Sequence, residues 1–293
     1  MSVRSSATPY CVIGNPIAHS RSPDIHAYFA ARTGQDMLYE RCLAPIDGFA
    51  ATVRQLIADG YGGASITVPF KLEAAALADR LTARAQAAGA VNTLLFGADG
   101  IVGDNTDGAG LVGDIVRNAG VSIAGKRVLV LGAGGAVRGA ILPLLSERPG
   151  ALVIANRTRA TADALAAHFK GHADGHAGAH AGGHNVSACD FADIGAPGGE
   201  HAAPFDIVIN GTSASLAGAL PPVPAAAFAH GALAYDMMYG ARPTPFMAFA
   251  AAHGALARDG LGMLVEQAAE AFFLWRGVRP ATDEILARLR GAL

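Results

Sequence analysis

The sequence predicts an α/β fold of two domains, on the basis of three observations. Short apolar runs alternate with amphipathic stretches along almost the whole chain, as strands alternate with helices in α/β proteins. The length of 293 residues accommodates two domains of ordinary size. A glycine-rich turn at residues 132–135 follows the apolar run RVLVL and precedes a helical pattern, as in dinucleotide-binding domains.

The first series of elements ends near Asp107. Ser22 is predicted to cap its first helix, with Pro23 at the first helical position. The repetition of strand, helix and strand favours a parallel sheet. We expect strands at 10–14, 37–43, 64–68 and 90–96, and helices at 22–31, 47–59 and 72–88, the last as one helix or two.

The second series follows the same pattern. We expect strands at 127–131, 151–155, 206–210 and 232–235, and helices at 106–118, 134–145, 159–169, 246–252 and 261–275. The boundary between the two series predicts one domain over residues 1–107 and a Rossmann-type domain over 108–260. Residues 261–293 are expected to pack back on the first domain and complete it.

Composition excludes several classes of protein. The chain has 22 Lys and Arg against 24 Asp and Glu, so its net charge of −2 argues against a nucleic-acid partner. The N-terminus lacks the apolar core of a signal peptide. The longest segment without Asp, Glu, Lys or Arg, 207–235, contains Asn210 and a proline run that a membrane span would not tolerate. We therefore expect a cytoplasmic protein with no membrane or nucleic-acid partner.

The three cysteines, Cys11, Cys42 and Cys189, are too far apart for a CxxC site or a disulfide framework, and free thiols are expected. The segment HFKGHADGHAGAHAGGHN, residues 168–185, carries a histidine at every fourth position. On a helix these imidazoles would share one face and could bind a metal, but five glycines disfavour a helix. We predict a flexible surface insertion at about 170–185 and no metal site, with a metal-binding accessory protein as the alternative.

The clearest cofactor signal is RVLVLGAGGAVR at 127–138. A tight turn at Gly132 and a close backbone approach at Gly134 would place a pyrophosphate at a helix N-terminus. The third glycine of the GxGxxG pattern is replaced by Val137, so the motif is a variant. A glycine-rich turn without a ligand is the alternative interpretation.

The end of the next predicted strand indicates which dinucleotide is bound. NAD-dependent enzymes usually carry an acid here that binds the ribose 2′-hydroxyl, whereas this chain has Asn156-Arg157-Thr158-Arg159. Two guanidinium groups and a hydroxyl suit a 2′-phosphate, which favours NADP over NAD. Exposed arginines at an ordinary helix start are the alternative.

Polar residues also follow the strands predicted in the first domain. Lys71 follows the strand in SITVPFK and begins a helix, a position where a lysine has no capping role. The motif GDNTDG provides Asp107 as an acidic partner for it, and Asn92 lies in an apolar segment where its amide needs partners. The plainer alternatives are a solvated lysine and a capped helix start with solvated acids.

These motifs, in chain order, resemble the shikimate dehydrogenase family. The resemblance covers nearly the whole chain through GNPIAHSRSP, SITVPFK, GAVNT, GDNTDG, LGAGGAVRG, ANRT, INGTS, YDMMY, TPF and DGLGMLVEQAAEAF. It implies an N-terminal substrate domain, a Rossmann-type NADP-binding domain, and reversible hydride transfer between NADPH and 3-dehydroshikimate. Monomer and homodimer both remain open.

The resemblance also implies roles for individual positions. Lys71 would be the catalytic acid–base, and Asp107 would pair with it and bind a substrate hydroxyl. The substrate carboxylate and hydroxyls would be held by Ser20, Ser22, Thr67, Asn92, Tyr239 and Gln267. NADP would be held by Gly132, Ala133, Gly134, Gly135, Ala136, Asn156, Arg157, Thr158, Arg159, Met237 and Gly260.

Two positions depart from the family pattern. Ser65 stands where an asparagine is usual, and Ala83 stands where many members have an acid. Neither change removes Lys71 or Asp107, so activity is expected. The alternatives are a broad-specificity quinate/shikimate dehydrogenase that uses NAD or NADP, and a catalytically silent NADP-binding regulator.

Overall fold

The computed structural model describes residues 7–173 and 185–293, which form two compact units. The first contains the chain up to Gly110 together with Leu264–Gly291, and the second contains Leu111–Met263 with the last two residues. The chain therefore crosses between the units at 110/111, three residues after the predicted boundary, and returns at 263/264. The C-terminal helices belong mostly to the first unit, as the predicted architecture requires.

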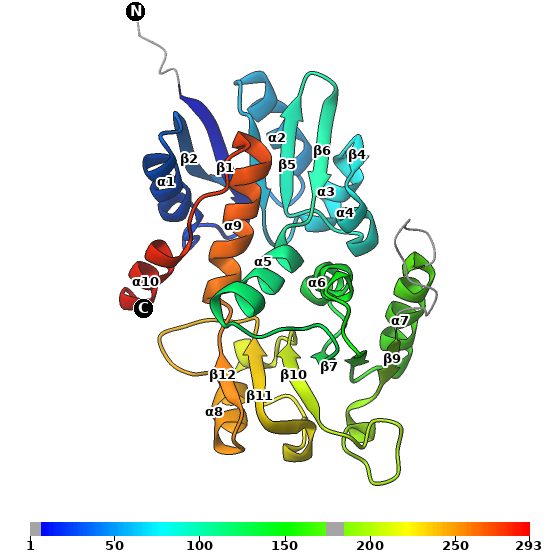
Figure 1. Ribbon diagram of the computed structural model, residues 1–293. Coiled ribbons are helices and arrows are strands. Elements are labelled where there is room, and N and C mark those ends of the chain that lie inside the picture. Colours follow the sequence, from blue (N-terminus) through cyan, green and yellow to red (C-terminus); the bar gives the residue numbers. More distant parts are fainter. Residues whose placement is uncertain (1–6, 174–184) are drawn as a thin grey trace, which may run out of the picture. The chain divides into compact units, whose positions relative to one another are not determined.

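The first unit is built on a six-stranded sheet with the strand order β2-β1-β3-β5-β6-β4 (Figure 1). Its elements are β1 (Thr8–Gly14), α1 (Ser22–Thr33), β2 (Met37–Leu43), α2 (Phe49–Ala58), β3 (Gly63–Ile66), α3 (Lys71–Leu77), β4 (Arg80–Leu81), α4 (Ala83–Ala88), β5 (Thr93–Gly97), β6 (Gly100–Asp104), α5 (Asp107–Gly113), α9 (Leu261–Arg276) and α10 (Asp283–Gly291). The stretch 72–88 thus forms two helices with a two-residue strand between them.

The prediction of a wholly parallel sheet is wrong for this unit. β5 runs antiparallel to both β3 and β6, whereas the other pairings are parallel. Only residues 98 and 99 separate β5 from β6, and so short a connection can form a hairpin but no crossover. The sequence analysis did not predict β6.

The predicted helix cap at Ser22 is also wrong. Ser22 is the first residue of α1, and Arg21 occupies the cap position without a side-chain hydrogen bond. The Ser22 amide instead donates to Ser20 Oγ at 3.3 Å, so a hydroxyl two residues earlier binds this N–H group.

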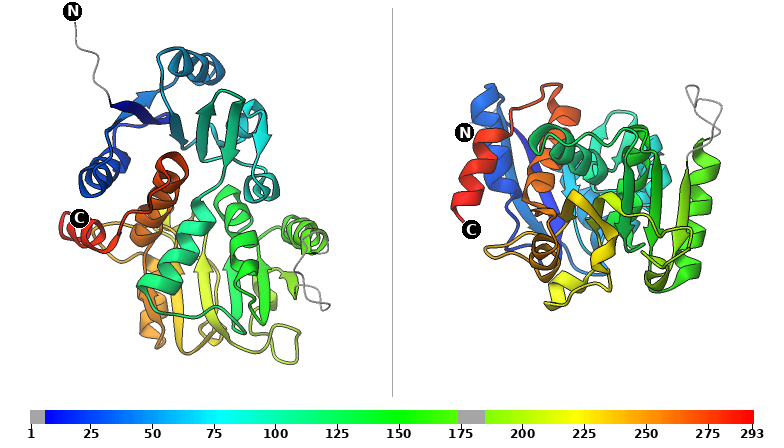
Figure 2. Two further views of the ribbon diagram at one scale, coloured as in Figure 1. Left: turned by 45° about the horizontal axis from the view of Figure 1, so that its top comes forward. Right: turned by 60° about the horizontal axis from the view of Figure 1, so that its bottom comes forward.

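The second unit is a doubly wound sheet whose six strands are all parallel, in the order β12-β11-β10-β7-β8-β9. α7 lies along β8 and β9, and α8 lies along β11 and β12 (Figure 2). Its elements are a π-helix (Asp114–Asn118), β7 (Arg127–Leu131), α6 (Gly135–Ser146), β8 (Ala151–Ala155), α7 (Arg159–Ala173), β9 (Val186–Cys189), β10 (Phe205–Asn210), β11 (Phe228–Asp236), α8 (Pro245–Ala252), β12 (Leu256–Arg258) and 3₁₀ turns at 191–193, 214–217 and 225–227.

A buried carboxylate fixes the start of the second unit. Asp114 is fully buried and accepts two hydrogen bonds from Arg258, at 2.8 and 2.5 Å, and one from the Tyr235 hydroxyl at 2.8 Å. These donors connect the π-helix to β11 and β12. A buried charge is tolerated when it is paired and hydrogen-bonded in this way.

Most of the predicted histidine-rich insertion, from residue 174 to 184, lies outside the described residues. Within the described ranges no three or more His, Cys, Asp or Glu side chains are grouped so that they could hold a metal ion. No helix formed by these residues has the length and apolar character needed to cross a membrane.

An aromatic core connects α1 to α9 in the first unit. His26 is fully buried, stacks on Tyr39 at 4.1 Å between ring centroids, and lies beside Phe272 and Trp275. Neither nitrogen of its ring has a hydrogen-bond partner among the described residues. Burial therefore lowers the pKa of His26 to about 3.

This buried imidazole should make the protein sensitive to acid. Below pH 6.5 an unfolded chain protonates His26 but the folded chain does not, so folding stability falls as the pH decreases toward 3. We expect the loss between pH 7 and pH 5 to be smaller in His26→Leu than in wild type by about 2 kcal/mol. Urea unfolding at both pH values measures this difference.

The control is His230→Gln, a change at an exposed histidine on β11. It should keep the wild-type difference between the two pH values. If His26→Leu also keeps that difference, His26 is not neutral in the folded protein.

Candidate active site

Four chain segments that carry predicted site residues lie at the same end of the strands of the first sheet, which is called here the site edge. The parallel neighbours β1 and β3 end there, at Gly14 and Ile66. Thr93 at the start of β5 is paired both with Ser65 on β3 and with Asp104 at the end of β6. The antiparallel orientation of β5 therefore brings the segment before β5 and the segment after β6 to the edge where β1 and β3 end.

Lys71 and Asp107 form an ion pair at the site edge. Lys71 Nζ lies 2.5 Å from Asp107 Oδ2, and the side chains retain 27% and 11% exposure. Asn92 lies just before β5 rather than inside a strand, and its Nδ2 donates to Asp107 Oδ1 at 2.8 Å. One carboxylate oxygen thus holds the lysine and the other is held by a buried amide, while the ammonium group still reaches solvent.

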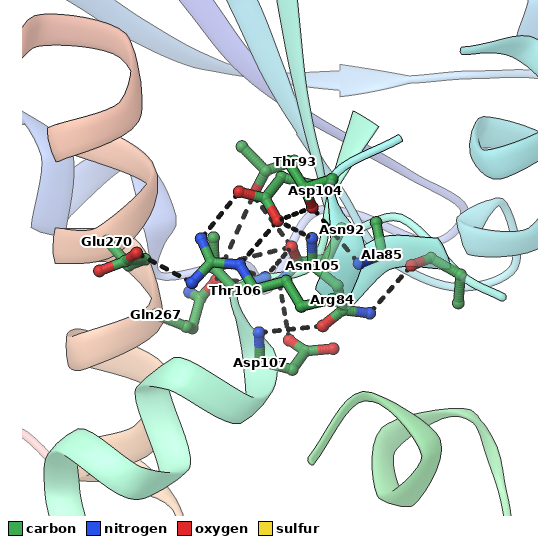
Figure 3. Close-up of polar contacts among 12 residues, drawn as sticks. Arg84, Ala85, Asn92, Thr93, Asp104, Asn105, Thr106, Asp107, Gln267 and Glu270 are labelled. Carbon is green, nitrogen blue, oxygen red and sulfur yellow. Dashed lines mark hydrogen bonds and ion pairs between the residues drawn. The ribbon is translucent and has the colours of Figure 1, made fainter. Parts of the chain in front are cut away.

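The buried amide of Asn92 is held on both its polar atoms. Its Oδ1 accepts from the Thr106 amide at 2.8 Å and from the Thr93 hydroxyl at 2.9 Å. Its Nδ2 also lies 3.5 Å from Gln267 Oε1 on α9 (Figure 3). Lys71, Asp107, Asn92 and Gln267 are therefore connected through hydrogen bonds inside one unit, although 196 positions separate the first from the last in the sequence.

Three predicted hydroxyl ligands follow β1 and β3: Ser20 lies on the loop after β1, Ser22 begins α1, and Thr67 lies on the loop after β3. Ser20 Oγ donates to Ser22 Oγ at 3.2 Å, and Arg41 fixes this loop by donating to the Ser20 carbonyl at 2.6 Å. Thr67 directly follows β3, where its amide donates to Ile13 O at 3.0 Å. A Cβ on Gly14 would lie 2.5 Å from the Thr67 methyl, so the glycine makes room for this side chain.

The substitution at Ser65 is accommodated inside the same unit. Its hydroxyl accepts a hydrogen bond from the Tyr39 hydroxyl at 2.8 Å, and Ser65 is buried while Tyr39 is partly buried. Burial raises the pKa of Tyr39, which keeps this phenol protonated as a donor. The Ser65 hydroxyl therefore has a hydrogen-bond partner, although the usual asparagine is absent.

Tyr239 is the one predicted substrate residue in the second unit. It follows β11, two residues after Met237, and is partly buried. The structure thus places seven of the eight predicted catalytic and substrate-binding residues in the first unit, and Tyr239 in the unit that also contains all the predicted cofactor residues.

The glycine-rich turn lies at the switch point of the second sheet. The order of strands reverses between β7 and β10, the place where doubly wound sheets bind their ligands. Gly132 adopts φ +102°, which favours glycine, and Gly134 caps the 12-residue helix α6 without a side-chain hydrogen bond. A Cβ at Gly134 or Gly135 would meet no atom within 4 Å, so this helix N-terminus opens to solvent beside exposed Ala136.

The missing third glycine at Val137 is compensated across the sheet. Val137 is fully buried, and a Cβ on Gly211 would lie 2.4 Å from its methyl group. Gly211 follows β10 and thus supplies the space that a glycine at position 137 normally supplies. The variant motif therefore retains the close packing of α6.

Gly211 also borders Met237, a predicted cofactor residue that in turn contacts a second one, Gly260. A Cβ at Gly211 would lie 3.1 Å from Met237 Sδ, and a Cβ at Gly260 would lie 2.1 Å from Met237 O. Met237 and Gly260 therefore lie in direct contact, close to the glycine-rich turn. The sequence analysis quoted the motif INGTS but did not identify Gly211 as part of this site.

The two predicted phosphate-binding arginines differ in their surroundings. Arg159 donates to Asp163 at 2.9 Å and to Asp193 at 3.0 Å, whereas Arg157 is exposed and has no ion-pair partner among the described residues. Asn156 Nδ2 donates to the Thr158 carbonyl at 3.1 Å and shapes the loop between them. Arg157 is thus the guanidinium available for an anionic ligand, and Arg159 is largely occupied by carboxylates.

Comparisons with known proteins show which family the chain resembles in sequence and in fold. The chain matches models of the shikimate dehydrogenase substrate-binding domain over residues 12–94, of shikimate/quinate 5-dehydrogenase over 114–217, and of the shikimate 5′-dehydrogenase C-terminal domain over 260–290. It is 59% identical to the shikimate dehydrogenase (NADP(+)) of Herminiimonas arsenicoxydans, with 97% of each chain covered.

Two solved structures are similar over nearly the full length. An Ael1 enzyme from Pseudomonas putida is 45% identical with a TM-score of 0.86, over 97% of this chain and 98% of that one. The shikimate 5-dehydrogenase of Thermus thermophilus, solved with NADP(H) and shikimate, is 30% identical with a TM-score of 0.81, over 98% and 100%. With the geometry of both units, these relationships establish that the chain belongs to the shikimate dehydrogenase family.

Proposed function

We propose that this chain catalyses the reversible reduction of 3-dehydroshikimate to shikimate with NADPH, with Lys71 and Asp107 as its catalytic pair. The observation that carries the proposal is the 2.5 Å ion pair between these side chains, anchored by buried Asn92 at the edge where the strand ends meet. This is the reaction of the shikimate pathway, and we place the protein in the cytoplasm. A homodimer remains a prediction that light scattering can test.

Lys71 supplies the proton that the reduction needs. A ketone that accepts a hydride becomes an alkoxide, and an ammonium group close to that oxygen stabilises the charge and donates the proton. Asp107 holds Nζ in place through Oδ2, and Asn92 keeps the carboxylate oriented through Oδ1. In the reverse direction neutral Lys71 removes the proton from the substrate hydroxyl.

The remaining polar groups of the first unit suit a small hydroxylated carboxylic acid. Hydroxyl groups are offered by Ser20 on the loop after β1, Ser22 at the start of α1 and Thr67 after β3. Asn92 and Gln267 offer amides. Such donors bind carboxylate and hydroxyl oxygens by hydrogen bonds. Tyr239, which belongs to the second unit, is proposed as a further ligand of the substrate.

The second unit fits NADP. The uncapped N-terminus of α6 offers free amide groups to a pyrophosphate, and the open space at Gly134 and Gly135 lets a ligand approach the backbone. Arg157, Thr158 and Asn156 follow β8, where the 2′-phosphate is expected. We propose that Gly132 to Ala136 and Arg157 hold NADP, and that Met237 and Gly260 border the nicotinamide. When bound, NADPH supplies the hydride.

A spectrophotometric assay at about 340 nm tests the function directly. Shikimate and quinate are each combined with NADP⁺ and NAD⁺, and we expect activity with shikimate and NADP⁺ to exceed the other combinations by at least about tenfold. Equal activity with quinate or NAD⁺ would assign the chain to the broad-specificity alternative. A folded protein that is inactive in all four assays would support the silent regulator.

The catalytic role of Lys71 predicts a selective loss of turnover. Lys71→Met keeps most of the unbranched side chain but removes the ammonium, so kcat should fall by about 10²- to 10⁴-fold. The KM for NADP⁺ should change little, because the cofactor residues belong to the other unit. Lys126→Met is the matched control, since Lys126 is an exposed lysine paired with Asp206. A kcat within about threefold of wild type for Lys71→Met would refute the assignment.

The two arginines after β8 should differ in their effect on cofactor binding. Arg157→Ala should raise the KM for NADP⁺ by about tenfold or more, the value of one charge-assisted hydrogen bond to phosphate. Arg159→Ala should raise it by about threefold or less, because Asp163 and Asp193 already occupy that guanidinium. The KM for NAD⁺, measured in parallel, should not change in either variant. Equal effects of both variants would show that Arg159 exchanges its carboxylates for phosphate.

A further inference from the structure

A single guanidinium joins the two segments that provide Asp107 and Gln267. Arg84, on α4, donates from Nε and Nη2 to the two oxygens of Asp104, both at 2.7 Å. Its remaining Nη1 donates to Glu270 Oε1 on α9 at 2.9 Å (Figure 3). Arg84 and Glu270 are 186 positions apart in the sequence, so this contact ties distant parts of one unit together.

The hydrogen bonds from Arg84 to Asp104 fix the segment that precedes Asp107. Asp104 is 1% exposed, and besides Arg84 it accepts from the Thr82 hydroxyl and the Asn105 amide, both at 2.6 Å. Burial alone would raise the pKa of Asp104, but the hydrogen bonds and charge of Arg84 lower it below its usual range. The charged carboxylate therefore anchors the turn that leads to Asp107, three residues further on.

The hydrogen bond from Arg84 to Glu270 fixes the helix that carries Gln267. Residues three positions apart lie on the same face of a helix, so Glu270 and Gln267 point to the same side of α9 (Figure 3). Gln267 Oε1 lies 3.5 Å from Asn92 Nδ2 and 3.4 Å from the Thr106 hydroxyl. These distances are at the outer limit of hydrogen bonding, so a small shift of α9 would separate Gln267 from the other site residues.

The bridge depends on the shape of arginine. A planar guanidinium can bind one carboxylate with two donors and keep a third donor for another acid, which a lysine cannot do. The second carboxylate oxygen of Glu270 is bound by Arg279, which is 42% exposed and does not contact Asp104. Glu270 therefore has one partner, Arg84, that is 22% exposed and also binds Asp104, and a second partner, Arg279, that lies nearer the surface.

We propose that Arg84 and Glu270 are positioning residues that hold Gln267 at the correct distance from Asn92 and Asp107, and so determine the affinity for the hydroxylated substrate. The proposal rests on the proposed role of Gln267 as a substrate ligand. Because Gln267 would bind substrate and transition state alike, its displacement raises the KM for shikimate and leaves kcat nearly unchanged. The KM for NADP⁺ is not affected.

The experiment removes the bridge on the α9 side, where the fold is least at risk. Glu270→Leu deletes the acceptor but leaves both hydrogen bonds from Arg84 to Asp104, whereas Glu270→Gln keeps an acceptor oxygen. Arg279→Met is the matched control, because it removes the more exposed partner of Glu270 and leaves the contact between Glu270 and Arg84. Each change is made in the wild-type and in the Gln267→Ala background, and kcat, both KM values and the melting temperature are measured.

We expect Glu270→Leu to raise the KM for shikimate by about tenfold, Glu270→Gln to restore it to within about threefold, and Arg279→Met to leave it within about twofold. In the Gln267→Ala background, Glu270→Leu should raise the KM for shikimate by less than about a further twofold, because Gln267, the residue through which it acts, is gone.

If Glu270→Leu raises the KM for shikimate by the same factor in the wild-type and the Gln267→Ala background, the proposal is overturned. A lower melting temperature with an unchanged KM would also overturn it, as would an equal rise in KM for Arg279→Met. If Gln267→Ala itself leaves the KM for shikimate unchanged, the role of Gln267 is wrong and the positioning role falls with it. If Gln267→Ala raises that KM but Glu270→Leu does not, the site stands and only the positioning role is refuted.

Discussion

The buried amide of Asn92 is the interaction on which the first unit's site depends. An amide that is 3% exposed must find partners inside the protein, and those of Asn92 are the backbone and side chains of the segment that leads to Asp107. The same amide therefore satisfies its own hydrogen bonds and fixes the carboxylate that holds Lys71. The contacts that satisfy this buried amide therefore also fix the geometry of the ion pair between Asp107 and Lys71.

Much of the site could be predicted because its chemistry is local in the sequence. Lys71 follows its strand directly, and the glycine-rich turn lies between a strand and a helix that both have clear patterns. What could not be predicted was long-range pairing. The hairpin of β5 and β6 was missed although Asp99-Gly100 is a turn signal, whereas the partner of buried Asp104, an arginine on a separate helix, has no signal in the sequence.

In the second unit the glycine-rich motif differs from the usual pattern but keeps the close packing of its helix against the sheet. The glycine pattern requires close packing between helix and sheet, not glycine at one fixed position. At Val137 this chain has the larger residue on the helix and Gly211 on the neighbouring strand end. The similar contrast between Arg157 and Arg159 was hidden from the sequence, because the carboxylates that occupy Arg159 lie 4 and 34 positions further along the chain.

Because β5 runs antiparallel to its neighbours, the open end of the β5–β6 hairpin and its turn lie at opposite ends of the strands, and only the open end carries site residues. Asn92 and Asp107 flank the open end of the hairpin, where the site lies. The turn at residues 98–99 therefore lies at the other end of the strands, five residues away along each of them. Changes of length in this turn extend the hairpin away from Asn92 and Asp107. It is therefore a natural point of insertion, at which the chain could acquire a tag, a label or an additional module without a change in its chemistry.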